Sequence, residues 1–242
     1  RFSLAGLPSL ARVSRDGHRG ASVTSGRCVF YNCLFDGNLD RRAMIYGTDG
    51  HGLYASGASL ALYDCSFVTN GLAESITSTA ETGSPCREGF VGTAVYALRC
   101  RDVTAAGCRF IGQRMTEHSG GSVFCIAGAS VASQNPSVSH SHQFVISNCL
   151  FAANSSVQWI SSSYPCNSAP LAFLGSDYDA CPGTAIVERC TFAYNSYASG
   201  QDAAALLVTQ GKSTSTWFVR VRNSIFSLSR ALCSLAGKDV LG

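Results

Sequence analysis

The chain is poor in charged residues and has no long apolar run. Of its 242 residues, 14% are Asp, Glu, Lys or Arg, and the net charge is +3. So small a charge gives no basis for binding nucleic acid, and no apolar segment approaches the length that crosses a bilayer. Gly-x-Ser-x-Gly, Gly-x-x-x-x-Gly-Lys and Cys-x-x-Cys are also missing. Their absence removes common nucleophile, phosphate-binding and zinc motifs from consideration.

What the sequence has instead is a repeated phrase, Cys-x-Phe-x-x-Asn. Four copies match, and they begin at Cys33, Cys65, Cys149 and Cys190; two degenerate copies begin at Cys108 and Ser224. Successive copies start 32 to 43 residues apart. Recurrence at this scale is typical of stacked coils, in which no single coil can bury its own apolar face.

Each phrase follows a stretch with the alternation of a half-buried strand. The residues five and three places before the first position of the phrase are apolar in all six copies. A third short run lies further upstream in each copy, for example Leu53–Ala55 or Leu171–Phe173. Apolar residues two apart predict strands with one buried face. Three short strands per repeat describe one turn of a parallel β-helix.

The chain must bend immediately before each phrase, because the apolar residues on either side of that point are three positions apart instead of two. Asn, Asp or Gly occupies the bending position in five copies, and Arg189 is the exception. These three residue types tolerate a left-handed backbone. We expect Cys and Phe of the phrase to point inward and Asn to close the next corner, where amides about 4.8 Å apart can hydrogen-bond along the axis. The predicted structural ladder is Cys33, Phe35, Asn38, Cys65, Phe67, Asn70, Cys108, Phe110, Cys149, Phe151, Asn154, Cys190, Phe192 and Asn195.

A Gly-Gly-Ala-Ile-like run followed by Phe-x-x-Asn resembles the polymorphic outer membrane protein repeats of chlamydial autotransporter adhesins, and more broadly the pectin-lyase-like superfamily. The resemblance spans about residues 20 to 229 and implies an all-β, right-handed parallel β-helix solenoid of about six coils. A leucine-rich-repeat-like solenoid is the alternative. Two observations argue against this alternative. Successive copies of the phrase start further apart than the 20 to 29 residues of a leucine-rich repeat, and no leucines follow the Asn to form a convex side.

The repeats predict one domain over residues 1–242, with coils at about 20–38, 51–70, 92–113, 120–154, 169–195 and 203–229. The sequence begins without Met and ends soon after the last repeat, so we expect it to be part of a longer chain. A solenoid also needs its ends covered. We therefore expect end-to-end contact with further coils or neighbouring subunits.

Twelve cysteines are numerous for a cytosolic domain. Five share the first position of the phrase, and we expect them to be small buried thiols rather than disulfides. Cys166 and Cys181 flank one loop, and the sequence leaves open whether a disulfide closes it. A disulfide there favours an extracellular or cell-surface location. Reduced cysteines fit an intracellular location equally well.

The candidate catalytic residues do not form a common site in the repeat pattern. The superfamily resemblance draws attention to Asp49-Gly50-His51-Gly52 and to Arg220-Val221-Arg222, which only partly match the motifs of its hydrolases. Those enzymes also need carboxylates at equivalent positions on neighbouring coils, whereas Asp64, Asp102 and Glu188 each occupy a different place in the repeat. We expect no catalytic residues and no cofactor.

Metal sites are no better supported. His140 and His142 lie close together in a Ser-rich stretch that we interpret as an exposed loop. Asp177 and Asp179 lack the Gly and Glu spacing of a calcium loop. We expect no metal site at either pair.

The remaining expectation is a non-catalytic surface or secreted protein that acts in adhesion or as a structural element. Its inserts at 71–91, 125–143 and 155–182 carry Trp159, Tyr164 and Tyr178 and are the expected contacts with protein or carbohydrate. One alternative is a polysaccharide lyase or glycoside hydrolase of the same fold. A second is a structural subunit of a filament, an appendage or another large assembly.

Overall fold

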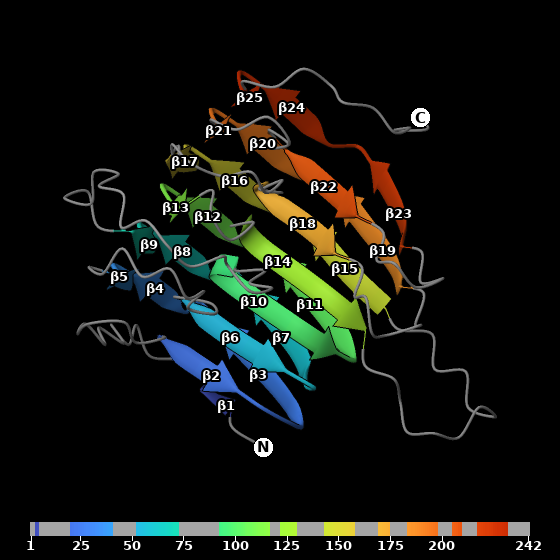
Figure 1. The fold of residues 1–242 in the computed structure, drawn as a ribbon. Helices are drawn as coiled ribbons and strands as arrows, with labels where there is room; N and C mark the ends of the chain where they lie inside the picture. Colours follow the sequence, from blue (N-terminus) through green and yellow to red (C-terminus); the bar gives the residue numbers. More distant parts are fainter. Residues whose placement is uncertain are drawn as a thin grey trace, which may run out of the picture.

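The computed structural model describes residues 3–4, 20–40, 52–72, 92–116, 122–129, 143–157, 169–174, 183–197, 205–209 and 217–231. Within these ranges every regular element is a strand, and the strands stack in parallel as a β-helix of six coils (Figure 1). The predicted all-β solenoid is confirmed. The leucine-rich-repeat alternative is not the fold, because parallel sheets surround the core.

Four parallel sheets run along the stack, and we number them in the order in which each coil visits them. The first sheet comprises β2 (Ala21–Val23), β6 (Leu53–Ser56), β10 (Gly92–Cys100), β14 (Ser122–Ala129), β18 (Leu171–Leu174) and β22 (Leu206–Thr209). The second comprises β1 (Ser3–Leu4), β3 (Arg27–Tyr31), β7 (Ser59–Tyr63), β11 (Asp102–Ala106), β15 (Gln143–Ser147), β19 (Gly183–Glu188) and β23 (Trp217–Arg222).

The other two sheets consist of shorter strands. The third comprises β4 (Leu34–Asp36), β8 (Ser66–Val68), β12 (Arg109–Ile111), β16 (Leu150–Ala152), β20 (Thr191–Ala193) and β24 (Ile225–Ser227). The fourth comprises β5 (Leu39–Asp40), β9 (Gly71–Leu72), β13 (Arg114–Thr116), β17 (Ser155–Val157), β21 (Ser196–Tyr197) and β25 (Arg230–Ala231). Each coil thus has four strands where the sequence predicted three.

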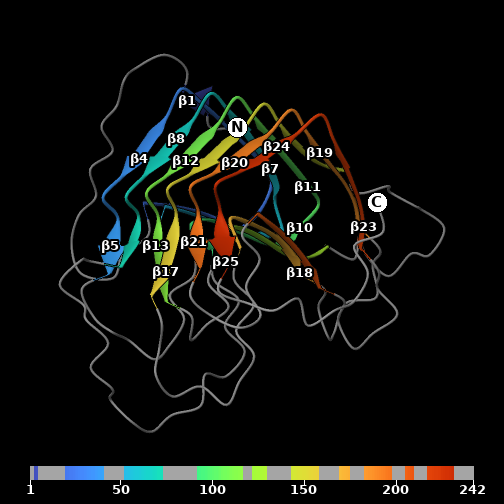
Figure 2. The same ribbon diagram turned by 90° about the horizontal axis from the view of Figure 1, so that it is seen from above.

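The coils wind in the right-handed sense. Seen from the C-terminal end in Figure 2, the chain passes counter-clockwise from the first sheet to the second, third and fourth as it rises toward the viewer. Right-handed crossover is the rule for parallel strands, because a twisted strand packs back onto its sheet only that way.

The observed register matches the apolar columns seen in the sequence. In the second sheet, Phe30 pairs with Leu62, Leu62 with Ala105, and Ala105 with Ile146. In the third sheet, Phe35, Phe67, Phe110, Phe151, Phe192 and Phe226 form one column. Neighbouring rings lie 4.5 to 5.1 Å apart, with planes 2° to 11° from parallel. Burial of one such side chain stabilises the fold by roughly 1.5–3 kcal/mol.

The corner before each phrase has a left-handed backbone in all six coils. The φ angles are 50° to 54° at the five non-glycine residues, Arg189 included, and 69° at Gly107. A Cβ on Gly107 would meet the carboxylate of Asp64 in the coil below, so a larger residue there would displace that side chain, and glycine adopts the left-handed backbone without steric cost. At the next corner the left-handed residue is the one before the Asn, for example Ala153 or Tyr194. The corner that each Asn was predicted to close is therefore present, and its left-handed residue lies one position before the Asn.

Candidate functional site

The Asn column is a continuous hydrogen-bonded ladder inside the coil. The side-chain oxygen of each residue accepts the backbone N–H of its equivalent in the preceding coil, at 2.9 to 3.2 Å. Its side-chain NH2 donates to the carbonyl of the preceding coil's Phe, at 2.8 to 3.1 Å. Gln113 fills this role where Asn is replaced. The ladder residues Asn38, Asn70, Gln113, Asn154 and Asn195 are all buried.

The amide ladder is incomplete at its N-terminal end and modified at its C-terminal end. Asn38 Oδ1 is buried without a hydrogen-bond partner among the described residues. In the last coil, the Ser229 hydroxyl accepts the backbone N–H of Asn195 at 3.2 Å in place of an amide. Between these ends, each ladder side chain has partners in the coil, which leaves no polar group there for a ligand.

The Cys column forms a second, weaker ladder beside the first corner. Cys149 Sγ donates to the carbonyls of Ser147 at 3.2 Å and Ala105 at 3.6 Å, and Cys65, Cys108 and Cys190 make the equivalent pair of contacts. These four are buried free thiols, and Cys33 is a partly buried one. The prediction of buried thiols rather than disulfides is confirmed for these residues.

Burial and mutual hydrogen bonding shift the pKa values of several described thiols. Burial raises the pKa of Cys100 to about 11. Hydrogen bonding to Cys108 and burial also raise the pKa values of Cys65 and Cys149, whereas hydrogen bonding to Cys149 lowers the pKa values of Cys108 and Cys190. Because reactivity requires the thiolate, Cys65, Cys100 and Cys149 lack the properties of a nucleophile. Cys166 and Cys181 lie outside the described residues, as do Cys86 and Cys233.

The carboxylates of the described strands lie on separate ladders. Asp102 accepts a hydrogen bond from the Ser59 hydroxyl at 3.3 Å, and Asp36 accepts one from Thr69 at 2.9 Å. Glu188 pairs with Arg189 at 2.7 Å and with Arg222 at 2.6 Å. The register places none of these acids opposite another on a neighbouring coil. Each therefore has a structural partner instead of a second carboxylate.

The other sequence candidates are placed as follows. Within β23, Arg220 and Arg222 are exposed. The Asp49–His51 segment, both histidine and aspartate pairs, and Trp159, Tyr164 and Tyr178 lie outside the described residues. In the part that the structure does describe, no group of three or more His, Cys, Asp or Glu side chains could hold a metal ion. That same part has no helix that could cross a membrane.

The insert boundaries need correction, because strands occupy part of each. Residues 71–72 belong to β9, 125–129 to β14, 155–157 to β17 and 171–174 to β18. The remaining long connections all begin or end at strands of the first sheet. The sequence that interrupts the repeat therefore joins strands of the first sheet to the strands before or after them.

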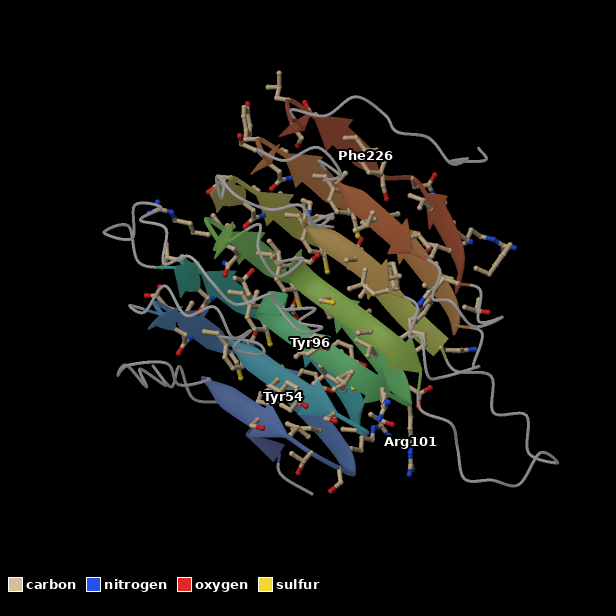
Figure 3. All side chains as sticks on the ribbon, viewed as in Figure 1. Tyr54, Tyr96, Arg101 and Phe226 are labelled. Atoms are coloured by element: carbon tan, nitrogen blue, oxygen red, sulfur yellow. The ribbon has the colours of Figure 1, made fainter. Side chains whose placement is uncertain are left out.

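The outer face of the first sheet carries a second apolar cluster that the sequence analysis missed. Tyr96, Cys125, Ala127, Ala172 and Leu174 are buried there, with Tyr54, Leu98 and Leu207 packed against them. Figure 3 shows Tyr54 and Tyr96 side by side on this face, with ring centroids 5.8 Å apart. One strand showed a sign of this cluster in the sequence. Leu171–Leu174 is apolar at four consecutive positions instead of alternating with polar residues, which indicates a strand buried on both faces.

The last coil is the most exposed apolar surface of the described chain. Eight large hydrophobic side chains are exposed, and six of them are Val208, Phe218, Val221, Ile225, Phe226 and Leu228. Phe226 stacks on Phe192 with centroids 5.1 Å apart, yet Phe226 is 53% exposed and Phe192 is fully buried. Figure 3 shows Phe226 on the terminal coil. No further strand of the described ranges covers the core column at this end.

Comparison with known proteins identifies no relative. No family model, no curated protein and no solved structure matches the chain.

Proposed function

We propose that the chain is a non-catalytic β-helix of a surface or secreted protein, acting in adhesion or as a structural element. The observation that carries the proposal is the separation of Asp36, Asp102 and Glu188, each of which already has a structural partner. The residue types that recur, Cys, Phe and Asn, are all used in packing and turning. What remains for recognition is the sequence between the coils.

Protein or carbohydrate is the proposed partner, and the connections that flank the first sheet are the proposed contact region. They carry the aromatic residues Trp159, Tyr164 and Tyr178, of the kind that stack on sugars or fill pockets in a partner protein. A rigid stack with variable connections along one side is a common arrangement for binding proteins. The repeat likeness to autotransporter adhesins agrees with this role and with an extracellular location.

A pectin-lyase-like lyase or hydrolase is the catalytic alternative. Such an inverting hydrolase needs two carboxyl groups about 6.5–9.5 Å apart across the scissile bond. The described strands supply no such pair from equivalent positions on neighbouring coils, and this weighs against the alternative. A structural subunit of a larger assembly is favoured by a different observation, the exposed apolar side chains of the last coil.

Two assays on the same protein separate adhesion from catalysis. The chain is incubated with neutral and acidic polysaccharides, and cleavage is followed by new reducing ends and by the ultraviolet absorbance of unsaturated uronates. We expect no release above a heat-unfolded control. Reproducible cleavage that requires folded protein would overturn the proposal.

Binding is tested on an immobilised glycan panel and on cell surfaces. Replacing residues 158–168 by a Gly-Ser linker should abolish binding while the circular dichroism spectrum stays unchanged. The matched control is Arg109→Ser in β12, on a different sheet, which should bind like the parent. Undiminished binding after replacement of every long connection in turn would contradict the assignment to these connections.

A further inference from the structure

The Cys column places one sulfur atom on each of five successive coils, in a line along the stack. Its members are Cys33, Cys65, Cys108, Cys149 and Cys190. In the last four, Sγ contacts the carbonyl two residues earlier and a carbonyl of the preceding coil, so these side chains share one orientation. Backbone hydrogen bonds to the cysteine carbonyls from the residues that follow the next coil's cysteines keep the column in register. Each interior thiol therefore has one sulfur neighbour above it and one below it.

The thiols of this column also interact with one another. Hydrogen bonding to Cys149 and Cys65 lowers the pKa of Cys108, and hydrogen bonding to Cys149 lowers the pKa of Cys190. The same interactions raise the pKa values of Cys65 and Cys149. A cysteine binds a metal ion as the thiolate. Thiols that release a proton readily therefore alternate along the column with thiols that keep it.

The distance between coils fits a cation held by two sulfur atoms in a straight line. The Phe rings two residues after the cysteines record the coil spacing, because their centroids lie 4.5 to 5.1 Å apart from Phe35 to Phe192. With a metal–sulfur bond of about 2.3 Å, as found for zinc, a linear sulfur–metal–sulfur unit spans about 4.6 Å. A cation can therefore take the place of a thiol proton between successive sulfur atoms without movement of the backbone.

The linear arrangement restricts the kind of cation. Structural zinc needs four ligands in a tetrahedron, and in the described ranges no group of three or more His, Cys, Asp or Glu side chains could hold a metal ion. Mg²⁺ and Ca²⁺ require shells of oxygen ligands. Sulfur selects soft cations, of which Cu⁺ is the biological example and Ag⁺ its heavier relative. Both accept two ligands in a line.

We propose that the Cys column binds soft monovalent cations of the Cu⁺ class, one between each two successive thiols. Each cation replaces one thiol proton. A metal–sulfur bond forms as the S–H bond breaks, the proton leaves to solvent, and the neighbouring sulfur donates a lone pair as the second ligand. Because one positive charge replaces another, the buried column gains no net charge and avoids the cost of an unpaired ion. The site is separate from the proposed recognition by the connections and does not depend on it.

Silver ion is the probe, because it binds thiols without needing a reductant to keep it monovalent. The full chain is refolded from urea with Ag⁺ in chloride-free buffer, which gives the cation access to positions that are buried after folding. Dialysis against excess glutathione then removes Ag⁺ from isolated cysteines, since two thiols held in place bind more tightly than separate ones. Native mass spectrometry counts the cations that remain. We expect about one for each gap between column thiols, and retention of none would overturn the proposal.

Single variants test the position of the cations. Cys108 borders two gaps, so Cys108→Ala should lose two of the retained cations. Cys190 borders one gap, because Ser224 follows it in the last coil, and Cys190→Ala should lose one. The matched control is Cys100→Ala, which removes a buried thiol of the first sheet outside the column and should lose none. With all three variants folded by circular dichroism, equal losses would overturn the assignment to the column.

X-ray absorption at the silver edge tests the geometry on the same samples. We expect two sulfur neighbours at a single distance and no nitrogen or oxygen. Three or four sulfur neighbours would assign the cations to clustered cysteines elsewhere in the chain and would overturn the proposal. Neither result bears on glycan binding, which is measured separately on the metal-free protein.

Discussion

Two buried columns turn the chain at successive corners of every coil, and they are held in different ways. In the Cys column, each thiol makes long contacts of 3.2 to 3.6 Å to carbonyls that are already used in the sheets. In the Asn column, each amide satisfies a backbone N–H and a carbonyl through contacts of 2.8 to 3.2 Å. The thiols therefore make weaker contacts than the amides.

Both columns meet a backbone need at a corner, but they meet it with different strength. A left-handed residue interrupts the sheet before each Asn, so backbone groups there would be buried without partners unless a side chain reached them. A left-handed residue also precedes each Cys, and the Ser224 hydroxyl that replaces Cys in the last coil accepts the backbone N–H of Cys190 at 3.2 Å. Sulfur is a weaker hydrogen-bonding partner than an amide.

The largest expected effect is therefore at an interior amide. Asn154→Leu keeps the approximate volume but leaves the N–H of Gln113 and the carbonyl of Phe110 buried without partners. We expect the free energy of unfolding to fall by about 3 kcal/mol or more. Urea denaturation followed by circular dichroism measures it. A loss below about 1 kcal/mol would mean that the amide only fills space.

High pH should lower the free energy of unfolding through the thiols, because amide side chains do not titrate. The pKa of Cys100 is raised by burial from the ordinary value of 9.0 to about 11. Between these values the unfolded chain loses a proton that the folded chain keeps, so the free energy of unfolding falls as pH rises and levels off above pH 11. This group accounts for a fall of about 3 kcal/mol.

Urea denaturation at a series of pH values from 8 to about 11 measures this effect. Cys100→Ala should weaken the pH dependence by removing one contributing group. An unchanged slope in that variant would exclude Cys100 as a contributor.

A thiol of the Cys column should cost less to remove than an amide. Cys149→Ala deletes one small buried group and two weak contacts, and we expect a loss of about 1 kcal/mol. Because Cys149 lies in the same coil as Asn154, the two variants can be compared under identical urea denaturation. Equal losses would remove the distinction between the columns.

The smallest expected effect concerns backbone strain. Ala153 has φ 54°, and Ala153→Gly relieves that strain while increasing the entropy of the unfolded chain. We expect a net stabilisation of roughly 0.5 kcal/mol. At the Cys corner, Asn148→Gly should change stability less, because Asn already tolerates the left-handed region. Thermal unfolding of both variants provides the comparison.

The sequence predicts the columns better than the corners. Register in the second and third sheets follows from apolar side chains at fixed distances from the phrase, and every coil repeats them. The left-handed residue of the second corner was not identified, because Thr69, Ala153 and Tyr194 carry no sign of a left-handed backbone. Among the residues at this corner, only Gly37 and Gly112 are of a type that favours a left-handed backbone.

Two further features could not be found from residue pattern alone. Strands of two or three residues, such as β9 and β21, are too short to show alternation, so the fourth sheet was missed. The apolar outer face of the first sheet left one sign in the sequence, the four consecutive apolar residues Leu171–Leu174, but the other residues of the cluster are set by which strands become neighbours. The burial of the Cys column was predictable, because one inward position per coil is occupied by the same small residue.

The direction of the hydrogen bonds has a mechanical consequence. Each interior strand pairs with the coil above and the coil below, so the bonds lie parallel to the long axis. A force that pulls the two ends of the described stack apart loads one coil boundary at a time. A force applied across the stack must shear several sheets together. The molecule should therefore yield easily lengthwise and resist sideways load.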